Sequence, residues 1–136
     1  MRSINDFVRE VTHARKRTGI VLLNDHELLR HFEDCGLKLI NLAEMEVKKT
    51  IQTDDELLTL IMGSSSKQAT LVVNLELFIA PRLNDLKYLE YLLTKLVVKE
   101  PRLPVFLGFY SEVVFAYFQK YYLSQSATQN HVYEAY

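Results

Sequence analysis

Short apolar runs alternate with amphipathic stretches along most of this chain, and this alternation restricts its fold more than any other feature. The apolar runs lie at 18–23, 37–42, 69–78 and 104–109. The stretches with apolar side chains at helical spacing lie at 3–17, 24–35, 43–62, 84–100 and 110–123. Strands that alternate with helices predict a three-layer α/β fold, with a mostly parallel sheet of about four strands flanked by helices.

Local signals place several element ends. Ser3 with Asp6 predicts the start of the first helix, and Gly36 predicts the end of the second. Thr53 and Glu56 have the spacing of a capping box in front of a further helix. The stretch GSSSK at 63–67 predicts a loop.

Length and composition favour one soluble domain. The chain has 136 residues and a formal net charge of −1, so no overall field favours nucleic acid or membrane. We expect a single α/β domain at 1–123 and a polar C-terminal tail at 124–136. Neither a signal-peptide pattern nor an apolar run of 18 residues is present, and Cys35 is the single cysteine. We therefore expect a cytoplasmic protein without a membrane partner.

The carboxyl ends of parallel strands are where α/β proteins bind ligands. After Leu23 come Asn24, Asp25, His26 and Glu27. A phosphate-binding loop needs glycines that let the backbone wrap the phosphates and a lysine that reaches them, and this segment has neither. Asn24 and Glu27 have capping-box spacing, so we expect Asn24 to cap the next helix.

The other strand ends also lack the groups of a nucleotide hydrolase. Asn74 stands where an aspartate would hold magnesium, and Glu76 is expected to bond to a neighbouring loop. Gly108, Phe109 and Tyr110 predict a packed, apolar end of the last strand. Asn24, Asp25, Asn74 and Glu76 are thus the polar residues of a cleft for which we expect no cofactor, with ATP and magnesium as the alternative.

Two further groups of residues are candidates for binding. His31 and Cys35 are one helical turn apart, but two ligands do not make a zinc site, so no metal is expected. Arg15, Lys16 and Arg17 follow a helix, where they either complement its dipole or contact the phosphates of DNA. A second basic segment contains Lys99 and Arg102.

Aromatic residues are concentrated near the C-terminus. The stretch VVFAYFQKYYL at 113–123 is apolar on more than one helix face, and one packed face would not cover it. Aromatic side chains are common in protein interfaces. We expect an interface, with another protein or a second copy, formed by Phe115, Tyr117, Phe118, Tyr121 and Tyr122.

Part of the chain resembles a response-regulator receiver domain. VLLNDHELLRHFEDCGLKLI is similar to the receiver's opening, and LVVNLELF and LPVFLGF continue the likeness. The resemblance puts Asn24 and Asp25 at the receiver's acidic pair and Asn74 at its phosphoacceptor. It implies a pseudo-receiver with a flavodoxin-like sheet, which could not be phosphorylated.

Nearly the whole chain is similar to the small P-loop protein of bacteriophage-exclusion (BREX) type 3 gene clusters. The resemblance covers the leading helix, GLKLINLAEMEVKKTI, LVVNLELFIAPRLNDLKYLEYLL and the ending HVYEAY. LLNDHELL stands where that family has its glycine-rich loop, and Val73 stands where it has an acidic residue. The resemblance implies a P-loop NTPase-like fold and a place in a multi-protein phage-defence system.

These observations lead to one expected function and three alternatives. We expect a non-catalytic assembly subunit that binds other subunits of an antiviral system or itself. The alternatives are a nucleotide-binding protein or weak NTPase that uses Asp25 and Glu76, a DNA-binding adaptor that uses Arg15, Lys16 and Arg17, and a pseudo-receiver signalling module.

Overall fold

Five strands and four helices make up the part of the chain that the computed structural model describes, residues 3–15, 17–44, 54–76, 94–95, 101–124 and 131–134. The strands are β1 (Thr18–Leu22), β2 (Lys38–Asn41), β3 (Thr70–Val73), β4 (Val105–Phe109) and β5 (Val132–Glu134). The helices are α1 (Ile4–His13), α2 (His26–Asp34), α4 (Asp54–Ser65) and α7 (Glu112–Ser124). The helix predicted at 84–100 and the capping residue Thr53 lie outside the described residues.

All five strands pair in parallel in the order β2-β3-β4-β1-β5, which confirms the predicted parallel α/β sheet. The flavodoxin-like alternative is wrong. That fold has the order 2-1-3-4-5, with β1 beside β2. Here β1 lies between β4 and β5, and both β3 and β4 separate it from β2. The sheet therefore differs from a receiver's in its connections, although the order of elements along the chain is the same.

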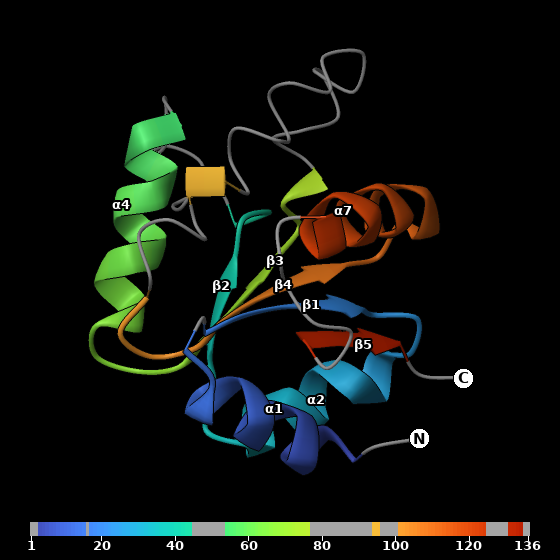
Figure 1. Ribbon diagram of the computed structural model, residues 1–136, viewed down its shortest axis with the longest axis horizontal. Helices are drawn as coiled ribbons and strands as arrows, with labels where there is room; N and C mark the ends of the chain where they lie inside the picture. Colours follow the sequence, from blue (N-terminus) through green and yellow to red (C-terminus); the bar gives the residue numbers. More distant parts are fainter. Residues whose placement is uncertain are drawn as a thin grey trace.

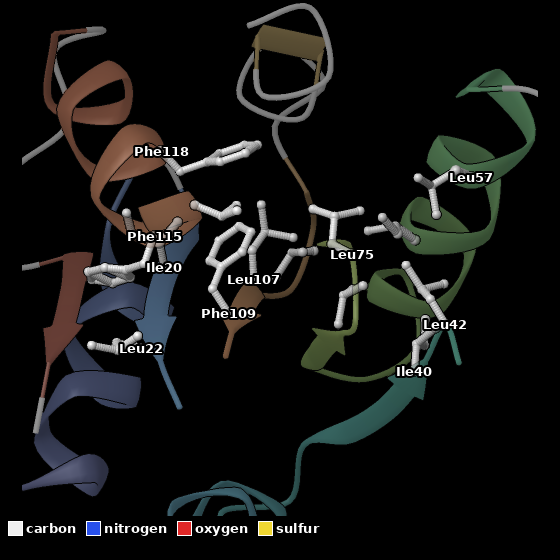
Figure 2. Packing of buried hydrophobic residues seen from close by; sticks show 14 of the residues in the cluster. Ile20, Leu22, Ile40, Leu42, Leu57, Leu75, Leu107, Phe109, Phe115 and Phe118 are labelled. Atoms are coloured by element: carbon white, nitrogen blue, oxygen red, sulfur yellow. The ribbon is translucent and has the colours of Figure 1, made fainter. Parts of the chain in front are cut away.

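Helices cover both faces of the sheet, as Figure 1 shows. On one face, α4 and α7 pack on side chains from all five strands, among them Ile20, Leu107 and Val132. Figure 2 shows this layer, in which Phe115 and Phe118 of α7 and Leu57 of α4 point toward the sheet. Because side chains alternate along a strand, the neighbouring positions face the other layer.

The second layer is formed by α1 and α2 and is rich in aromatic side chains. Phe7 of α1 is fully buried, with its ring centroid 5.4 Å from that of Phe106 and 5.2 Å from that of Tyr133. Gly19 makes this approach possible, because a Cβ there would lie 2.9 Å from Cδ1 of Phe106. The glycine in β1 is thus required by the packing of α1 on the sheet.

The predicted ends at Ser3 and Gly36 are confirmed, but α4 is longer than expected. Ser3 caps α1 by accepting a hydrogen bond from the Asp6 N–H, and Gly36 follows α2 with φ of 84°. Residues 63–65, predicted as loop, continue α4. The Ser65 hydroxyl bonds back to the carbonyl of Met62, and that of Ser64 lies 2.8 Å from the buried Thr70 hydroxyl. Serines satisfied in this way can remain in a helix.

The predicted polar tail contributes to the sheet. β5 falls within residues 124–136 and pairs with β1, with Val132 opposite Ile20 and Tyr133 opposite Val21. Val132 and Tyr133 are both buried, so the domain extends beyond residue 123. Two apolar residues among polar ones are too short a run to predict a strand; the open edge of β1 provides the partner that makes one.

The predicted aromatic interface is wrong for two of its members. Phe115 and Phe118 are 2% and 1% exposed, and the Phe118 ring centroid lies 4.9 Å from that of Phe109. They are buried because α7 packs across β1 and β4. Tyr117 is partly buried against the same layer. The side chains of Tyr121 and Tyr122 lie outside the described residues. None of the described helices is long and apolar enough to cross a membrane.

Candidate functional site at the carboxyl ends of the strands

The parallel sheet has its topological switch point between β1 and β4. From β1 the chain enters α2 on one face, whereas from β4 it enters α7 on the other. Adjacent strands whose connections leave in opposite directions open a crevice at their carboxyl ends, the usual ligand site of such folds. In this sheet, Asn24 and Asp25 follow β1, and Tyr110 and Ser111 follow β4, so they flank the switch point. Asn74 and Glu76 follow β3 at the same edge of the sheet.

Asp25, and not the predicted Asn24, caps α2. The Asp25 backbone is extended, and its Oδ1 accepts a hydrogen bond from the N–H of Glu27 at 2.9 Å. Only three residues separate the end of β1 from the start of α2. This short connection holds a carboxylate against the first turn of the helix, where a phosphate loop would place a phosphate.

Asn74 ends β3 through its backbone conformation. Its φ is 64°, in the left-handed region that asparagine tolerates better than other residues with side chains. Its Nδ2 donates to Oδ1 of Asn41 at 2.6 Å, and the same oxygen accepts from the N–H of Ala43 at 2.9 Å. The predicted strand 69–78 therefore stops at Val73, and the Asn74 amide joins the ends of β2 and β3.

Glu76 connects β3 to the start of α7. Its Oε2 accepts hydrogen bonds from the backbone N–H groups of Tyr110 and Ser111, both at 2.9 Å. This is the bond to a neighbouring loop that the sequence predicts. Two successive N–H groups in front of a helix form an anion site, and here the anion is a side chain of the protein itself. The second carboxylate oxygen, Oε1, is buried without a hydrogen-bond partner among the described atoms.

The end of β4 is less apolar than predicted. Ser111 sits just before α7, and its Oγ accepts from the N–H of Val114 at 3.3 Å. Tyr110 is 43% exposed. Partial burial, and then the charge of Glu76, raise the pKa of the Tyr110 hydroxyl above its ordinary value. Sequence reasoning missed Asn41, Tyr110 and Ser111. The available signals were a polar residue near the end of the apolar run 37–42 and the two residues with hydroxyl groups that follow the run 104–109.

The remaining candidates lie elsewhere. Arg15 and Arg17 precede β1 at the opposite, amino-terminal edge of the sheet, and Lys16 lies outside the described residues. Nη1 of Arg17 donates to the carbonyl of Arg102 at 2.7 Å, so the two basic segments of the sequence adjoin. Sγ of Cys35 lies 2.9 Å from Oδ1 of Asn5. In the described part of the chain, no three His, Cys, Asp or Glu residues are grouped so that they could hold a metal ion.

The fold defines the class of the molecule as a three-layer α/β protein with an all-parallel sheet. No protein-family model, no curated protein and no solved structure matches the chain.

Proposed function

We propose that this protein is a non-catalytic, P-loop-like assembly subunit of a prokaryotic multi-protein phage-defence system. The resemblance to the small P-loop protein of BREX type 3 clusters supports this role. The strand order supports it too: read from the other edge it is 5-1-4-3-2, the order of P-loop ATPases that have one strand added between the first and third strands.

The non-catalytic part of the proposal rests on the hydrogen bonds that the Glu76 side chain accepts. Its carboxylate already accepts bonds from the N–H groups of Tyr110 and Ser111, at the switch point where a substrate or water would be placed. Asp25 is likewise engaged by the Glu27 N–H. A general base or a magnesium ligand needs a free carboxylate that faces the substrate. Here one oxygen of each carboxylate accepts from the protein's own backbone, and the other oxygen of Glu76 is buried.

Electrostatics at the same edge act against a triphosphate. Asp25 and Glu27 bring two carboxylates to the first turn of α2, and Glu112 brings another to the first turn of α7. Each stabilises its own helix through the dipole. A nucleotide would have to bring further negative charge beside them, with no lysine in the three-residue connection between β1 and α2 to offset it.

Thermal unfolding with and without ATP and magnesium tests the non-catalytic role. A ligand present at 100 times its dissociation constant adds about 2.7 kcal/mol to the free energy of unfolding, which raises the melting temperature by several degrees. We expect no shift at millimolar ATP. A shift that is lost when Asp25 and Glu76 are both replaced by alanine would instead establish the nucleotide-binding alternative.

Co-purification tests the assembly role. The tagged protein, expressed with the products of its neighbouring genes, is expected to retain at least one of them through size-exclusion chromatography. A strict monomer that retains none would contradict the proposal. The same tagged protein with its neighbours omitted is the control, because it separates assembly with other subunits from self-association.

A DNA-binding adaptor is the second candidate, and the Arg17–Arg102 contact favours it. That contact joins two basic segments, one before β1 and one before β4, into a single surface. Phosphate contacts of this kind give binding that weakens steeply with salt. Binding to a labelled duplex that is unchanged when Arg15, Lys16 and Arg17 become alanine would reject this candidate.

A further inference from the structure

The described charges separate along the strand direction. Because all five strands are parallel, their carboxyl ends lie at one edge of the sheet and their amino ends at the other. A five-residue strand separates the two edges by about 17 Å. Among the described residues, these two edges differ in the sign of their charge.

The carboxyl edge is acidic. The acidic residues that follow or end the strands, or occupy the first turn of the next helix, are Asp25, Glu27, Glu44, Glu76, Glu112 and Glu134. Among the described residues that directly follow β1, β2, β3 and β4, as far as those first turns, none is a lysine or an arginine. Glu27, Glu44 and Glu112 are exposed.

The amino edge is basic. The basic residues that precede or begin the strands are Arg15, Arg17, Lys38, Lys67 and Arg102. Hydrogen bonds hold these segments side by side: Arg17 to the Arg102 carbonyl at 2.7 Å, and the Leu103 N–H to the Ser65 carbonyl at 3.2 Å. Glu33 and Asp34, at the end of α2, are acidic residues close to this edge. All of these basic residues are exposed except Arg17, which is half-buried.

Exposed apolar side chains accompany the acidic edge. Val113, in the first turn of α7, is 81% exposed, and Tyr110 is 43% exposed. A contact on this edge would bury apolar area as well as pair charges, and apolar burial supplies most of the stability of protein interfaces.

We propose that the basic amino edge of one copy docks on the acidic carboxyl edge of a second copy, in a head-to-tail contact. This inference rests on the proposed assembly role and names its partner as the chain itself. The two edges are complementary because they carry opposite charges. In the proposed contact, Arg15 and Arg102 face Glu44 and Glu112 of the next copy, beside Val113. Such a contact is heterologous, so each copy keeps one free edge of each sign and the assembly grows into a ring or a filament.

The test measures mass by light scattering over a range of concentrations and salt. Mass is expected to rise with concentration at about 0.05 M salt and to fall toward the monomer at about 0.5 M, as the screening length drops from roughly 14 Å to roughly 4 Å. Arg15→Glu with Arg102→Glu is expected to weaken self-association about tenfold or more, and Glu44→Lys with Glu112→Lys by a similar factor. In a mixture of the two double variants, the unchanged basic edge of one meets the unchanged acidic edge of the other, so the mixture is expected to associate more strongly than either variant alone.

A matched control keeps the charge change and moves it away from the edges. Arg9→Glu with Arg30→Glu alters two exposed arginines on α1 and α2, which cover a face of the sheet, and is expected to leave the mass unchanged. Circular dichroism checks that each variant folds. Should the Arg15 and Arg102 variant not fold, Lys38→Glu with Lys67→Glu reverses the same edge.

Three results would overturn the inference. They are a wild-type monomer at every concentration in low salt, self-association that both edge variants retain, and a mixture of the two that stays monomeric. A monomer that still retains a neighbouring gene product would refute the head-to-tail contact and leave the proposed function standing. A monomer that binds a DNA duplex and loses it on Arg15→Glu with Arg102→Glu would assign the basic edge to nucleic acid instead.

Discussion

The carboxylate of Glu76 lies 2.9 Å from the backbone nitrogen of Tyr110, across the carboxyl ends of β3 and β4. The bond joins residues 34 positions apart in the sequence. It places a negative charge of the protein on the N–H groups in front of α7, a position where many α/β proteins hold a bound anion.

Replacing Glu76 by alanine is expected to lower the free energy of unfolding by about 1–3 kcal/mol, because two backbone N–H groups lose their acceptor. Glu76→Gln keeps an oxygen that can accept both bonds and should cost less. Urea unfolding of the three proteins measures the difference. Equal stability of the alanine variant and the wild type would show that the bond contributes nothing.

The same charge makes the ionisation of Tyr110 sensitive to Glu76. Burial first, and Glu76 second, raise the pKa of Tyr110 above its ordinary value of 10.0. The neutral hydroxyl thus stabilises the folded state below that value, and this stabilisation is lost as pH rises through the folded pKa. Glu76→Gln should bring the pKa of Tyr110 part of the way back. Ultraviolet titration measures it, with Tyr110→Phe as the control that removes the signal of this tyrosine.

Asp25→Ala is expected to destabilise the protein by about 1 kcal/mol through loss of the α2 cap. Asp25→Ser retains an oxygen that accepts from the Glu27 N–H and should keep most of that stability. Thermal unfolding of both variants distinguishes a cap from a ligand-binding carboxylate. A stable alanine variant would indicate that Asp25 has a role other than capping.

Gly108→Ala is expected to destabilise the protein by about 1–3 kcal/mol through overpacking. A Cβ at this position would lie 2.7 Å from Cδ1 of Leu23 and 3.2 Å from Cγ1 of Val73. Gly63 is the matched control, because a Cβ there meets nothing within 4 Å and the residue lies inside α4. Gly63→Ala should stabilise by roughly 0.5–1 kcal/mol. Chemical denaturation that ranks the two in the opposite order would contradict the packing of β4.

Cys35 should react slowly with alkylating reagents near pH 8. Burial, and then the charge of Asp34, raise the pKa of its thiol, so the reactive thiolate is less populated than in a free cysteine. Asp34→Asn should increase the rate modestly, since the burial remains. Because the chain has one cysteine, labelling followed by mass spectrometry reports on this residue alone. A rate above that of the urea-unfolded chain would contradict the prediction.

The sequence by itself determined the fold class. β1 to β4 each fall within one of its four apolar runs, and Ser3 and Gly36 mark the ends of their helices as the pattern predicts. These signals depend only on neighbours along the chain. Glu76 could also be assigned to a loop contact, since a carboxylate without a metal or phosphate cradle has little else to bond.

Only the tertiary structure decided the rest. Hydrophobic spacing gives the same pattern for every strand order, so the place of β1 between β4 and β5 became visible only in the sheet. Phe115 and Phe118 are buried because α7 crosses β1 and β4, and Val132 and Tyr133 form a strand because the edge of β1 is open to them. Arg17 and Arg102 are 85 residues apart yet hydrogen-bonded. Contacts between distant residues depend on how elements pack, which local sequence patterns do not encode.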